Sequence, residues 1–355
     1  MRRAAFLLLA TPVALLALAA CVAAEPDDHA PTVTALATAP LESTALPTAV
    51  PSPSRAAPRA QRPVSAAAAA TRAARGTPVP AISSRTTRVS GCTADQSPGD
   101  FYQTLVTAAG DDRAYRLHVP SRYRSDRFTP LVFDFHGYGR SAAEEEAYSQ
   151  LVPIADRETF ILVTPEGSGY PPAWDIVGVY AENGIDDVTF VAELLDTLAT
   201  KVCVDTARVY ATGLSNGAEM AAQVACTLPS RFAAAAPVAG VVYQGCAGGA
   251  VAVVSFHGTD DFNVPFEFTP PAMADWAAHN GCDLSAGIAV IQLSDHVTRE
   301  SFAGCGAAPV VLYVVDGGGH TWPGAEDDAG GVGPTTHEIN ASELIWEFFR
   351  AHPKP

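Results

Sequence analysis

Residues 208–219 read RVYATGLSNGAE and carry the clearest clue to the fold and chemistry of this chain. An apolar, β-branched run is followed by Gly213-Leu214-Ser215-Asn216-Gly217, after which the sequence becomes helical in character. A serine between two glycines at such a junction is typical of a nucleophile elbow, where a strained turn projects the hydroxyl from a sheet and leaves little space for neighbouring side chains. The pattern therefore predicts that Ser215 is the nucleophile of a covalent mechanism.

Two later segments supply the residue types that would activate this serine. The buried-strand pattern at 251–256 ends in HGTDDFNVP, with Asp260 and Asp261, and the pattern at 310–315 ends in DGGGHTWPG, with His320. The chain order nucleophile, acid, histidine is that of the α/β-hydrolases. We expect His320 to remove the serine proton and Asp261 to orient the imidazole, with Asp260 left open as the alternative acid.

An oxyanion site is also expected. The apolar run PLVFDF at 130–135 delivers HGYGR at 136–140, which occupies the position of the loop that binds the developing negative charge. Backbone N–H groups of Tyr138 and Asn216 are the predicted donors. His136 and His257 are expected to hydrogen-bond their own loops and to have no role as bases.

These segments resemble a known family. HGYGRS, TPEGSG, CVDTARVYATGLSNGAEMA, APVAG, FHGTDDFNVPF, NGC and GGGHTWPG, within residues 91–352, are similar to the polyhydroxybutyrate depolymerase and feruloyl esterase group of secreted α/β-hydrolases. The resemblance implies an α/β-hydrolase fold and a triad of Ser215, Asp261 and His320. Ala218 stands where the group usually has a second glycine after the elbow, and Asp260 doubles the usual single acid.

The resemblance also implies the activity, which is that of a serine carboxylester hydrolase without a cofactor. Aromatic acyl esters of plant polysaccharide are the first expected substrates, and a hydroxyalkanoate polyester is the alternative. Trp174 and Trp322 are candidate walls for an aromatic acyl group, with core packing as an equal interpretation. A non-catalytic surface lipoprotein that uses a hydrolase scaffold for binding is the alternative of another class, and the complete triad order argues against it.

The N-terminal region indicates export. Arg2 and Arg3 precede an apolar stretch that ends at residue 20, and the sequence LAAC at 18–21 resembles a bacterial lipobox. We expect a signal peptide at 1–20, acylation of Cys21, and attachment to the outer face of the cell membrane, with an ordinary signal peptide as the alternative. Residues 21–90 are rich in Ala, Pro, Thr and Ser, which predicts a disordered linker before a catalytic domain at 91–355.

Domain architecture and composition narrow the remaining possibilities. Strand patterns that alternate with helical ones, such as the apolar face of 188–198 and the helix that starts near Asn340 and Glu343, predict a mostly parallel, doubly wound sheet. The first 90 residues hold nine of the 22 basic residues and four of the 38 acidic ones, which leaves a formal charge of −21 on residues 91–355. Such a surface repels nucleic acid.

The cysteines fit an oxidising compartment. Apart from Cys21, six remain, which is the number needed for three disulfides, and no spacing typical of a zinc site occurs, so no metal is expected. The resemblance and closeness in the chain favour a Cys282–Cys305 pair. The pairs Cys226–Cys246 and Cys92–Cys203 are weaker expectations.

Overall fold

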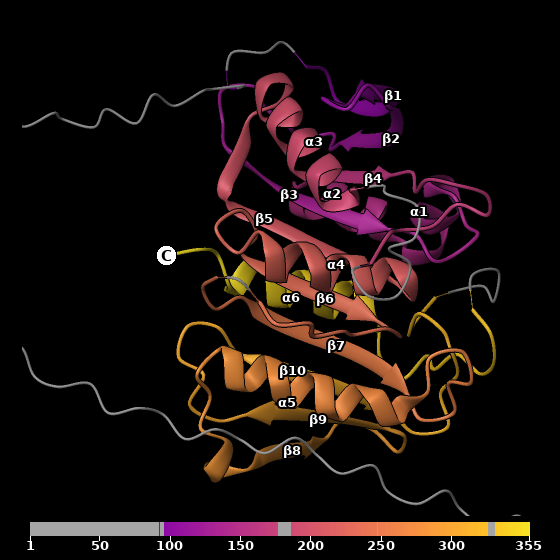
Figure 1. Ribbon diagram of the computed structural model, residues 1–355, viewed down its shortest axis with the longest axis vertical. Helices are drawn as coiled ribbons and strands as arrows, with labels where there is room; N and C mark the ends of the chain where they lie inside the picture. The colour runs from indigo at the N-terminus through magenta and orange to yellow at the C-terminus, as the bar shows by residue number, and fades with distance from the viewer. Residues whose placement is uncertain (1–91, 93–95, 177–185, 247, 326–330) are drawn as a thin grey trace, which may run out of the picture. The chain divides into compact units, whose positions relative to one another are not determined.

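The computed structural model describes residues 92, 96–176, 186–246, 248–325 and 331–355 (Figure 1). The predicted signal peptide, Cys21 and the predicted linker lie outside these residues. The strands are β1 (Gly99–Val106), β2 (Asp112–Val119), β3 (Thr129–Phe135), β4 (Ile161–Pro165), β5 (Val204–Leu214), β6 (Ala234–Val238), β7 (Ala252–Gly258), β8 (Ile288–Gln292), β9 (Val297–Phe302) and β10 (Val310–Val315). The helices are α1 (Ala142–Ser149), α2 (Leu151–Glu158), α3 (Asp187–Lys201), α4 (Asn216–Thr227), α5 (Thr269–His279) and α6 (Ala341–Ala351), with short 3-10 helices η3 (Phe266–Phe268) and η4 (Leu284–Ala286).

All ten strands form one sheet in the order β1-β2-β4-β3-β5-β6-β7-β10-β9-β8. The six strands from β4 to β10 in that order are parallel. Antiparallel pairs extend the sheet at both ends. The parallel strands end at the same edge of the sheet, as their arrowheads in Figure 1 show, so loops far apart in the sequence gather there.

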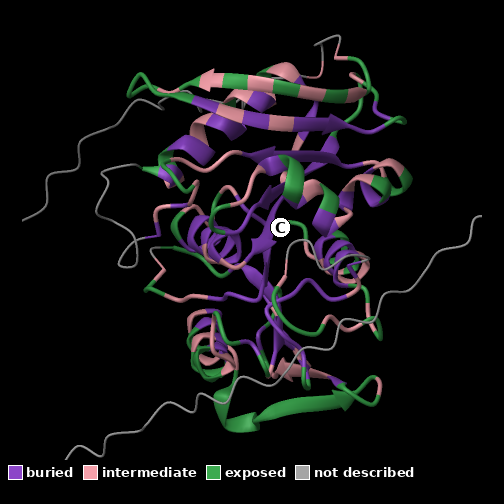
Figure 2. Ribbon diagram, turned by 90° about the vertical axis from the view of Figure 1, so that its right-hand side faces the viewer, coloured by how far each residue is buried: buried purple, intermediate pink, exposed green. Residues whose placement is uncertain are grey.

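Burial of the sheet follows its sequence pattern. Strands β3, β4, β6 and β7 are buried at every position. Continuous apolar runs of this kind are typical of parallel strands covered on both faces. The edge strand β1 alternates between half-buried and exposed residues, and the opposite edge strand β8 is exposed at all five positions (Figure 2).

Helices cover both faces of the sheet, which confirms the predicted doubly wound arrangement. Helices α1, α2 and α6 pack on one face, where Tyr210 of β5 stacks on Phe349 with ring centroids 4.6 Å apart. Helices α3, α4 and α5 lie on the other face, in front of the sheet in Figure 1. The predicted start of the last helix is present, because the Asn340 side chain accepts a hydrogen bond from the Glu343 N–H at 3.0 Å.

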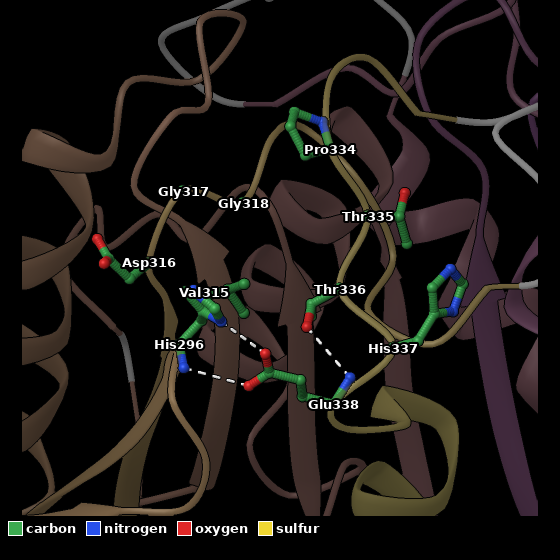
Figure 3. A pocket seen from close by; sticks show the side chains of 10 residues that line it. All are labelled: His296, Val315, Asp316, Gly317, Gly318, Pro334, Thr335, Thr336, His337 and Glu338. Carbon is green, nitrogen blue, oxygen red and sulfur yellow. Dashed lines mark hydrogen bonds and ion pairs between the residues drawn. The ribbon is translucent and has the colours of Figure 1, made fainter.

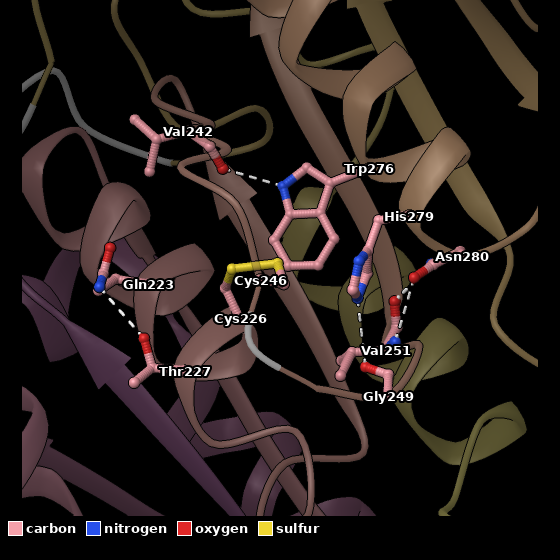
Figure 4. Close-up of a disulfide and its surroundings, with 10 residues drawn as sticks. All are labelled: Gln223, Cys226, Thr227, Val242, Cys246, Gly249, Val251, Trp276, His279 and Asn280. Carbon is pink, nitrogen blue, oxygen red and sulfur yellow. Dashed lines mark hydrogen bonds between the residues drawn. A yellow bond between two sulfur atoms is a disulfide. The ribbon is translucent and has the colours of Figure 1, made fainter. Parts of the chain in front are cut away.

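The structure contains three disulfides, Cys92–Cys203, Cys226–Cys246 and Cys282–Cys305. Cys226–Cys246 joins the end of α4 to the loop after β6, beside Trp276 of α5 (Figure 4). The Trp276 indole N–H donates to the Val242 carbonyl at 2.9 Å, so the same loop is held by a covalent bond and a hydrogen bond. Among the described residues, none of the helices has the length and apolar character needed to cross a membrane.

A pair of carboxyl groups is buried between β3 and α1. Asp134 of β3 accepts a hydrogen bond from the Ser149 hydroxyl at 2.7 Å, and its other oxygen has no partner among the described residues. Burial raises the pKa of Asp134 to about 7, and burial together with the charge of Asp134 also raises the pKa of Glu145. The two groups therefore share at least one proton below neutral pH.

Asp134→Asn should flatten the pH dependence of stability. The folded wild type keeps a proton on this pair that the unfolded chain loses above pH ~4, so its free energy of unfolding falls as the pH rises from ~4 towards 7. The amide carries no such proton, and the melting temperature of the variant should fall less over this range. A change of ~1 kcal/mol corresponds to about 2–4 °C in a domain of this size, which thermal unfolding at pH 5 and pH 8 resolves.

Asp275→Asn, on the exposed side of α5, is the matched control and should follow the wild type. A parallel pH dependence in wild type and Asp134→Asn would show that the buried carboxyl is ionised throughout.

Candidate active site

Ser215 lies in the sharp turn between β5 and α4. Its backbone has φ 57° and ψ −122°, a left-handed conformation that is uncommon for a residue other than glycine. A Cβ atom at Gly217 would lie 1.9 Å from the Phe135 carbonyl oxygen, and one at Gly213 would lie 2.4 Å from the same oxygen. Both positions must therefore be glycine for the turn to pack against β3, which is the predicted elbow geometry.

His320 and Asp261 meet at the same edge of the sheet. Asp261 follows β7 and His320 follows β10, and these two strands pair in parallel. The Asp261 Oδ2 atom lies 2.7 Å from His320 Nδ1, and both side chains are buried. Strand β6 alone separates β5 from β7, so the elbow and this pair lie at neighbouring strand ends.

The structure distinguishes the two acids that the sequence left open. Asp260 is exposed, and its backbone N–H donates to the Gly318 carbonyl. Asp261 turns inward, and its Oδ1 accepts from the backbone N–H groups of Asn263 and Val264, each at 2.9 Å. Asp261 is thus the acid in contact with the histidine.

The Asp261 carboxylate is held in its charged form. Burial acts to raise its pKa, but hydrogen bonds from His257, His320 and the Val264 N–H outweigh burial and hold the pKa well below its usual range. A carboxylate that stays ionised can stabilise an imidazolium on His320 during proton transfer.

His320 is held at its backbone as well as at its ring. Its N–H and C=O pair with Val332 through two hydrogen bonds of 2.8 Å. Two residues later, the Trp322 N–H donates to the Tyr148 hydroxyl of α1 at 3.0 Å. The histidine loop is therefore fastened to the helix that also packs behind β3.

The loop after β3 lies beside the elbow. A Cβ atom at Gly137 would lie 3.6 Å from the Ser215 Cβ, so the backbone of this loop passes close to the serine. Asn216 is the first residue of α4, where a backbone N–H has no acceptor within the helix. Its side chain is used elsewhere, since it exchanges two hydrogen bonds with the Trp174 backbone at 2.7 and 3.1 Å.

His136 has a structural position, as expected. Its Nε2 accepts from the Gly167 N–H at 2.8 Å, which leaves Nδ1–H to donate to the Gly137 carbonyl at 2.8 Å. Burial lowers its pKa, which favours this neutral form. The ring thereby joins the loop after β3 to the loop after β4.

The two tryptophans, for which a wall of the acyl site and core packing were equal interpretations, are buried in the core. Trp174 is 0% exposed and its indole N–H donates to the His136 carbonyl at 2.8 Å, while Trp322 is 1% exposed and bonds the Ser342 hydroxyl at 2.9 Å. Their burial gives no support to direct contact with a substrate. Exposed aromatic rings occur on other residues of these loops: Tyr138 (53%), Tyr170 (98%) and Phe262 (86%).

Glu219 is a partly buried carboxyl group that the sequence analysis missed. It lies one turn after Ser215 on α4, and burial raises its pKa. A hydrogen bond from the Asn216 side chain and the charge of His320 act in the opposite direction, so the group lies near both residues. The only sequence signal was its place in SNGAE, four residues after the serine.

A cavity of about 440 Å³ lies behind the loop that carries His320 (Figure 3). Its lining mixes apolar surface with charged side chains, which include an ion pair between His296 Nδ1 and Glu338 Oε1 at 2.6 Å and the carboxyl group of Asp316. None of its ten lining residues is Phe, Tyr or Trp. No group of three His, Cys, Asp or Glu side chains suited to a metal ion occurs in the part of the chain that the structure describes.

Comparison with known proteins shows that this chain is similar to esterases. Residues 113–263 match the family described as "Esterase PHB depolymerase". Feruloyl esterase D of Neurospora crassa is 29% identical over 261 residues, which cover 70% of this chain and 85% of that protein. The candidate esterase NocK of Nocardia uniformis subsp. tsuyamanensis is 31% identical over 282 residues, which cover 68% and 80% of the respective chains.

The fold is that of known α/β-hydrolases. The structure of an acetyl xylan esterase from Aspergillus awamori superposes with a TM-score of 0.56 and 18% identity, covering 71% of this chain and 99% of that chain. At this identity the likeness concerns the fold alone, and it confirms the predicted class.

Asp261→Asn and Asp260→Asn should differ sharply in hydrolysis of p-nitrophenyl acetate. The first removes the charge that faces His320 and allows the wrong imidazole tautomer, so kcat should fall by up to ~10⁴-fold. The second changes an exposed group, and its kcat should stay within about threefold of the wild type. A larger loss for Asp260→Asn would contradict the geometry described above.

Proposed function

This chain belongs to the Esterase PHB depolymerase family of carboxylic ester hydrolases, and we propose that it hydrolyses aromatic acyl esters with Ser215 as the nucleophile. The hydrogen bond between Asp261 and His320, at strand ends beside the Ser215 elbow, is the observation that carries the proposal. This hydrogen bond orients the buried His320 ring, which can then act as the base that activates the serine.

In this mechanism His320 Nε2, the ring nitrogen remote from Asp261, takes the proton of Ser215 as its Oγ attacks the ester carbonyl. The backbone N–H groups of Tyr138 and Asn216 hold the oxyanion. His320 then gives the proton to the leaving alcohol, and an acyl-enzyme remains on Ser215. Water, deprotonated by His320, attacks the acyl-enzyme, which releases the carboxylic acid and restores the serine.

An aromatic acyl group is supported by the side chains at the loop tips. Tyr138 follows β3, Tyr170 follows β4 and Phe262 adjoins Asp261, so three exposed rings come from loops at one edge of the sheet. Contact between the first two loops is supported by the hydrogen bond from Gly139 N–H to the Pro172 carbonyl at 2.7 Å. Flat apolar rings on a substrate bury well against such side chains. The names of the relatives, feruloyl esterases, agree with this class of ester.

A polyester substrate is the second candidate, and the edge strand β8 favours it. Ile288, Val290 and Ile291 are each about half exposed, and Leu293 continues the apolar surface. An exposed apolar strand of this kind offers a surface for adsorption to a solid polymer. It lies at the far end of the sheet, four strands beyond β6, so adsorption there would not itself bring a polymer chain to Ser215.

The three disulfides indicate an oxidising compartment outside the cytosol. Beyond this, we propose that residues 1–20 direct export, that Cys21 carries the lipid anchor, and that residues 21–90 tether the catalytic domain 91–355 to the outer face of the membrane. The support is the lipobox-like LAAC sequence and the Ala, Pro, Thr and Ser composition that follows it.

Ser215→Ala should remove nearly all hydrolysis of methyl ferulate and p-nitrophenyl acetate, because the alanine has no nucleophile. Thermal unfolding should stay close to that of the wild type, since the change removes one oxygen atom. Activity comparable to the wild type in a folded alanine variant would refute the mechanism. On amorphous polyhydroxybutyrate, rapid clearing by the wild type without turnover of methyl ferulate would place the polyester first.

Phe262→Ala tests the aromatic contact. It should lower kcat/KM for methyl ferulate about fivefold to tenfold, because ~1 kcal/mol of ring burial is lost, and should change p-nitrophenyl acetate less than twofold. Tyr102→Ala removes another exposed ring (65%, against 86% for Phe262) from edge strand β1 and should change the hydrolysis of neither substrate. Equal losses on both esters would exclude selective contact with the acyl ring.

Intact-mass measurement on protein extracted from its native membrane tests the anchor. The N-terminus should be Cys21 with attached acyl chains, which stable membrane attachment requires. Cys21→Ser should release the protein to the medium with its esterase activity retained. A mature wild-type protein that lacks residue 21 would exclude lipidation.

A further inference from the structure

A second histidine contacts the Asp261 carboxylate. His257 is at the end of β7, and its side chain is completely buried. Its Nε2 lies 3.1 Å from Asp261 Oδ2, the same oxygen that lies 2.7 Å from His320 Nδ1. One carboxylate oxygen therefore faces two imidazole rings. His257 precedes Asp261 in the sequence, and His320 follows it.

The surroundings of His257 define which of its nitrogens carries the proton. Nε2 also lies 2.8 Å from the Val264 carbonyl oxygen, so it faces two acceptors and must be the N–H donor. Nδ1 lies 2.7 Å from the Thr269 hydroxyl, which is buried at the start of α5 and can donate to the unprotonated nitrogen. The neutral ring with Nε2–H donates to the Val264 carbonyl at 2.8 Å and has Asp261 Oδ2 as a second, longer acceptor at 3.1 Å.

We propose that His257 is a positioning residue for the ester hydrolysis, whose Nε2–H holds Asp261 Oδ2 in place and shares its negative charge with His320. The proposal rests on the proposed function, since it concerns the acid of that triad. His257 itself touches neither the nucleophile nor the substrate.

The physical consequence concerns the strength with which Asp261 attracts the proton of His320. A carboxylate oxygen that already accepts one N–H hydrogen bond has less charge available for a second donor. His257 therefore limits the charge that Asp261 offers to the imidazolium form of His320, and loss of this contact should strengthen the interaction between Asp261 and His320. The lowered pKa of Asp261 agrees with this shared oxygen.

The other groups around His257 and Asp261 do not explain the limit on the charge that Asp261 offers to His320. Asp261 Oδ1 is occupied by the N–H groups of Asn263 and Val264, which carry no titratable proton. From α4, Glu219 is the ionisable group that senses the charge of His320. Asp260 is exposed, and the ring of Phe266, which lies edge-on to His257 at 5.8 Å, is uncharged.

Two amide substitutions at residue 257 separate positioning from simple packing. His257→Gln places an N–H group at about the reach of Nε2, so it can still donate to Asp261. His257→Asn has the same amide on a shorter side chain, which reaches towards Thr269 but not to Asp261. We expect His257→Asn to move the acid limb of the kcat/KM profile for p-nitrophenyl acetate upward by ~0.5–1 pH unit, while His257→Gln stays near the wild type.

A purely structural role predicts a different result. Both amides would then lower the melting temperature or the plateau of kcat/KM, with the acid limb unchanged, and that outcome would overturn the proposal. His279→Asn, on α5 with its ring bonded to the Gly249 carbonyl, is the control for a histidine-to-asparagine change outside the triad and should leave the acid limb in place.

A measurement on the wild type keeps the proposal testable if His257→Asn does not fold. In ¹⁵N-histidine-labelled protein at pH 8, the His257 ring, identified by the loss of its signals in His257→Gln, should show the Nε2–H tautomer. An Nδ1–H tautomer would overturn the proposal, because Nε2 could not donate to Asp261. This measurement does not depend on hydrolysis. Activity in Ser215→Ala would refute the proposed function, whereas an Nδ1–H tautomer of His257 would refute only this inference.

Discussion

The close approach of the elbow to strand β3 is the constraint on which the site depends. At Gly217 and Gly213 there is no space for a Cβ atom beside the Phe135 carbonyl oxygen, so α4 begins in direct backbone contact with the adjacent strand. This contact forces Ser215 into its left-handed conformation. It also brings the loop of Gly137 next to the serine, so the segment after β3 and the start of α4 lie side by side. A methyl group at residue 217 would disrupt the contact of α4 with β3, the conformation of Ser215 and the position of the Gly137 loop.

The sequence predicted the parallel centre of the sheet well, because strands buried on both faces appear as continuous apolar runs. The expected runs at 130–135, 251–256 and 310–315 coincide with β3, β7 and β10 to within two residues at each end. The outer strands β1, β2, β8 and β9 gave no such signal. Strands β1, β2 and β9 mix polar and apolar residues, whereas β8 is largely apolar but exposed, and the pairing of all four depends on contacts between segments that the local pattern does not specify.

Side-chain burial was the part of the site that the sequence could not predict. Trp174 and Trp322 adjoin motif residues, which made them candidates for substrate contact, yet their indole N–H groups bond the His136 carbonyl and Ser342, both distant in the chain. The choice between Asp260 and Asp261 as the acid also depended on side-chain burial, which the sequence pattern does not specify. It is decided by a turn in which the N–H groups of residues 263 and 264 converge on one carboxylate, and spacing alone only favoured that outcome. The contact of His257 with the acid was equally hidden, although the four-residue spacing in HGTDD permits it.

The disulfide between Cys92 and Cys203 determines how the domain bears a mechanical load. Cys92 lies at the start of the described chain, before edge strand β1, and Cys203 immediately precedes the central strand β5. A pull on the chain that precedes Cys92 is therefore transmitted through the sulfur atoms to the middle of the sheet. Strands β1 and β2, whose antiparallel ladder could open one hydrogen bond at a time, are bypassed by the covalent link. Such a force enters the sheet at the start of β5, where it is shared by two parallel ladders, one to β3 and one to β6.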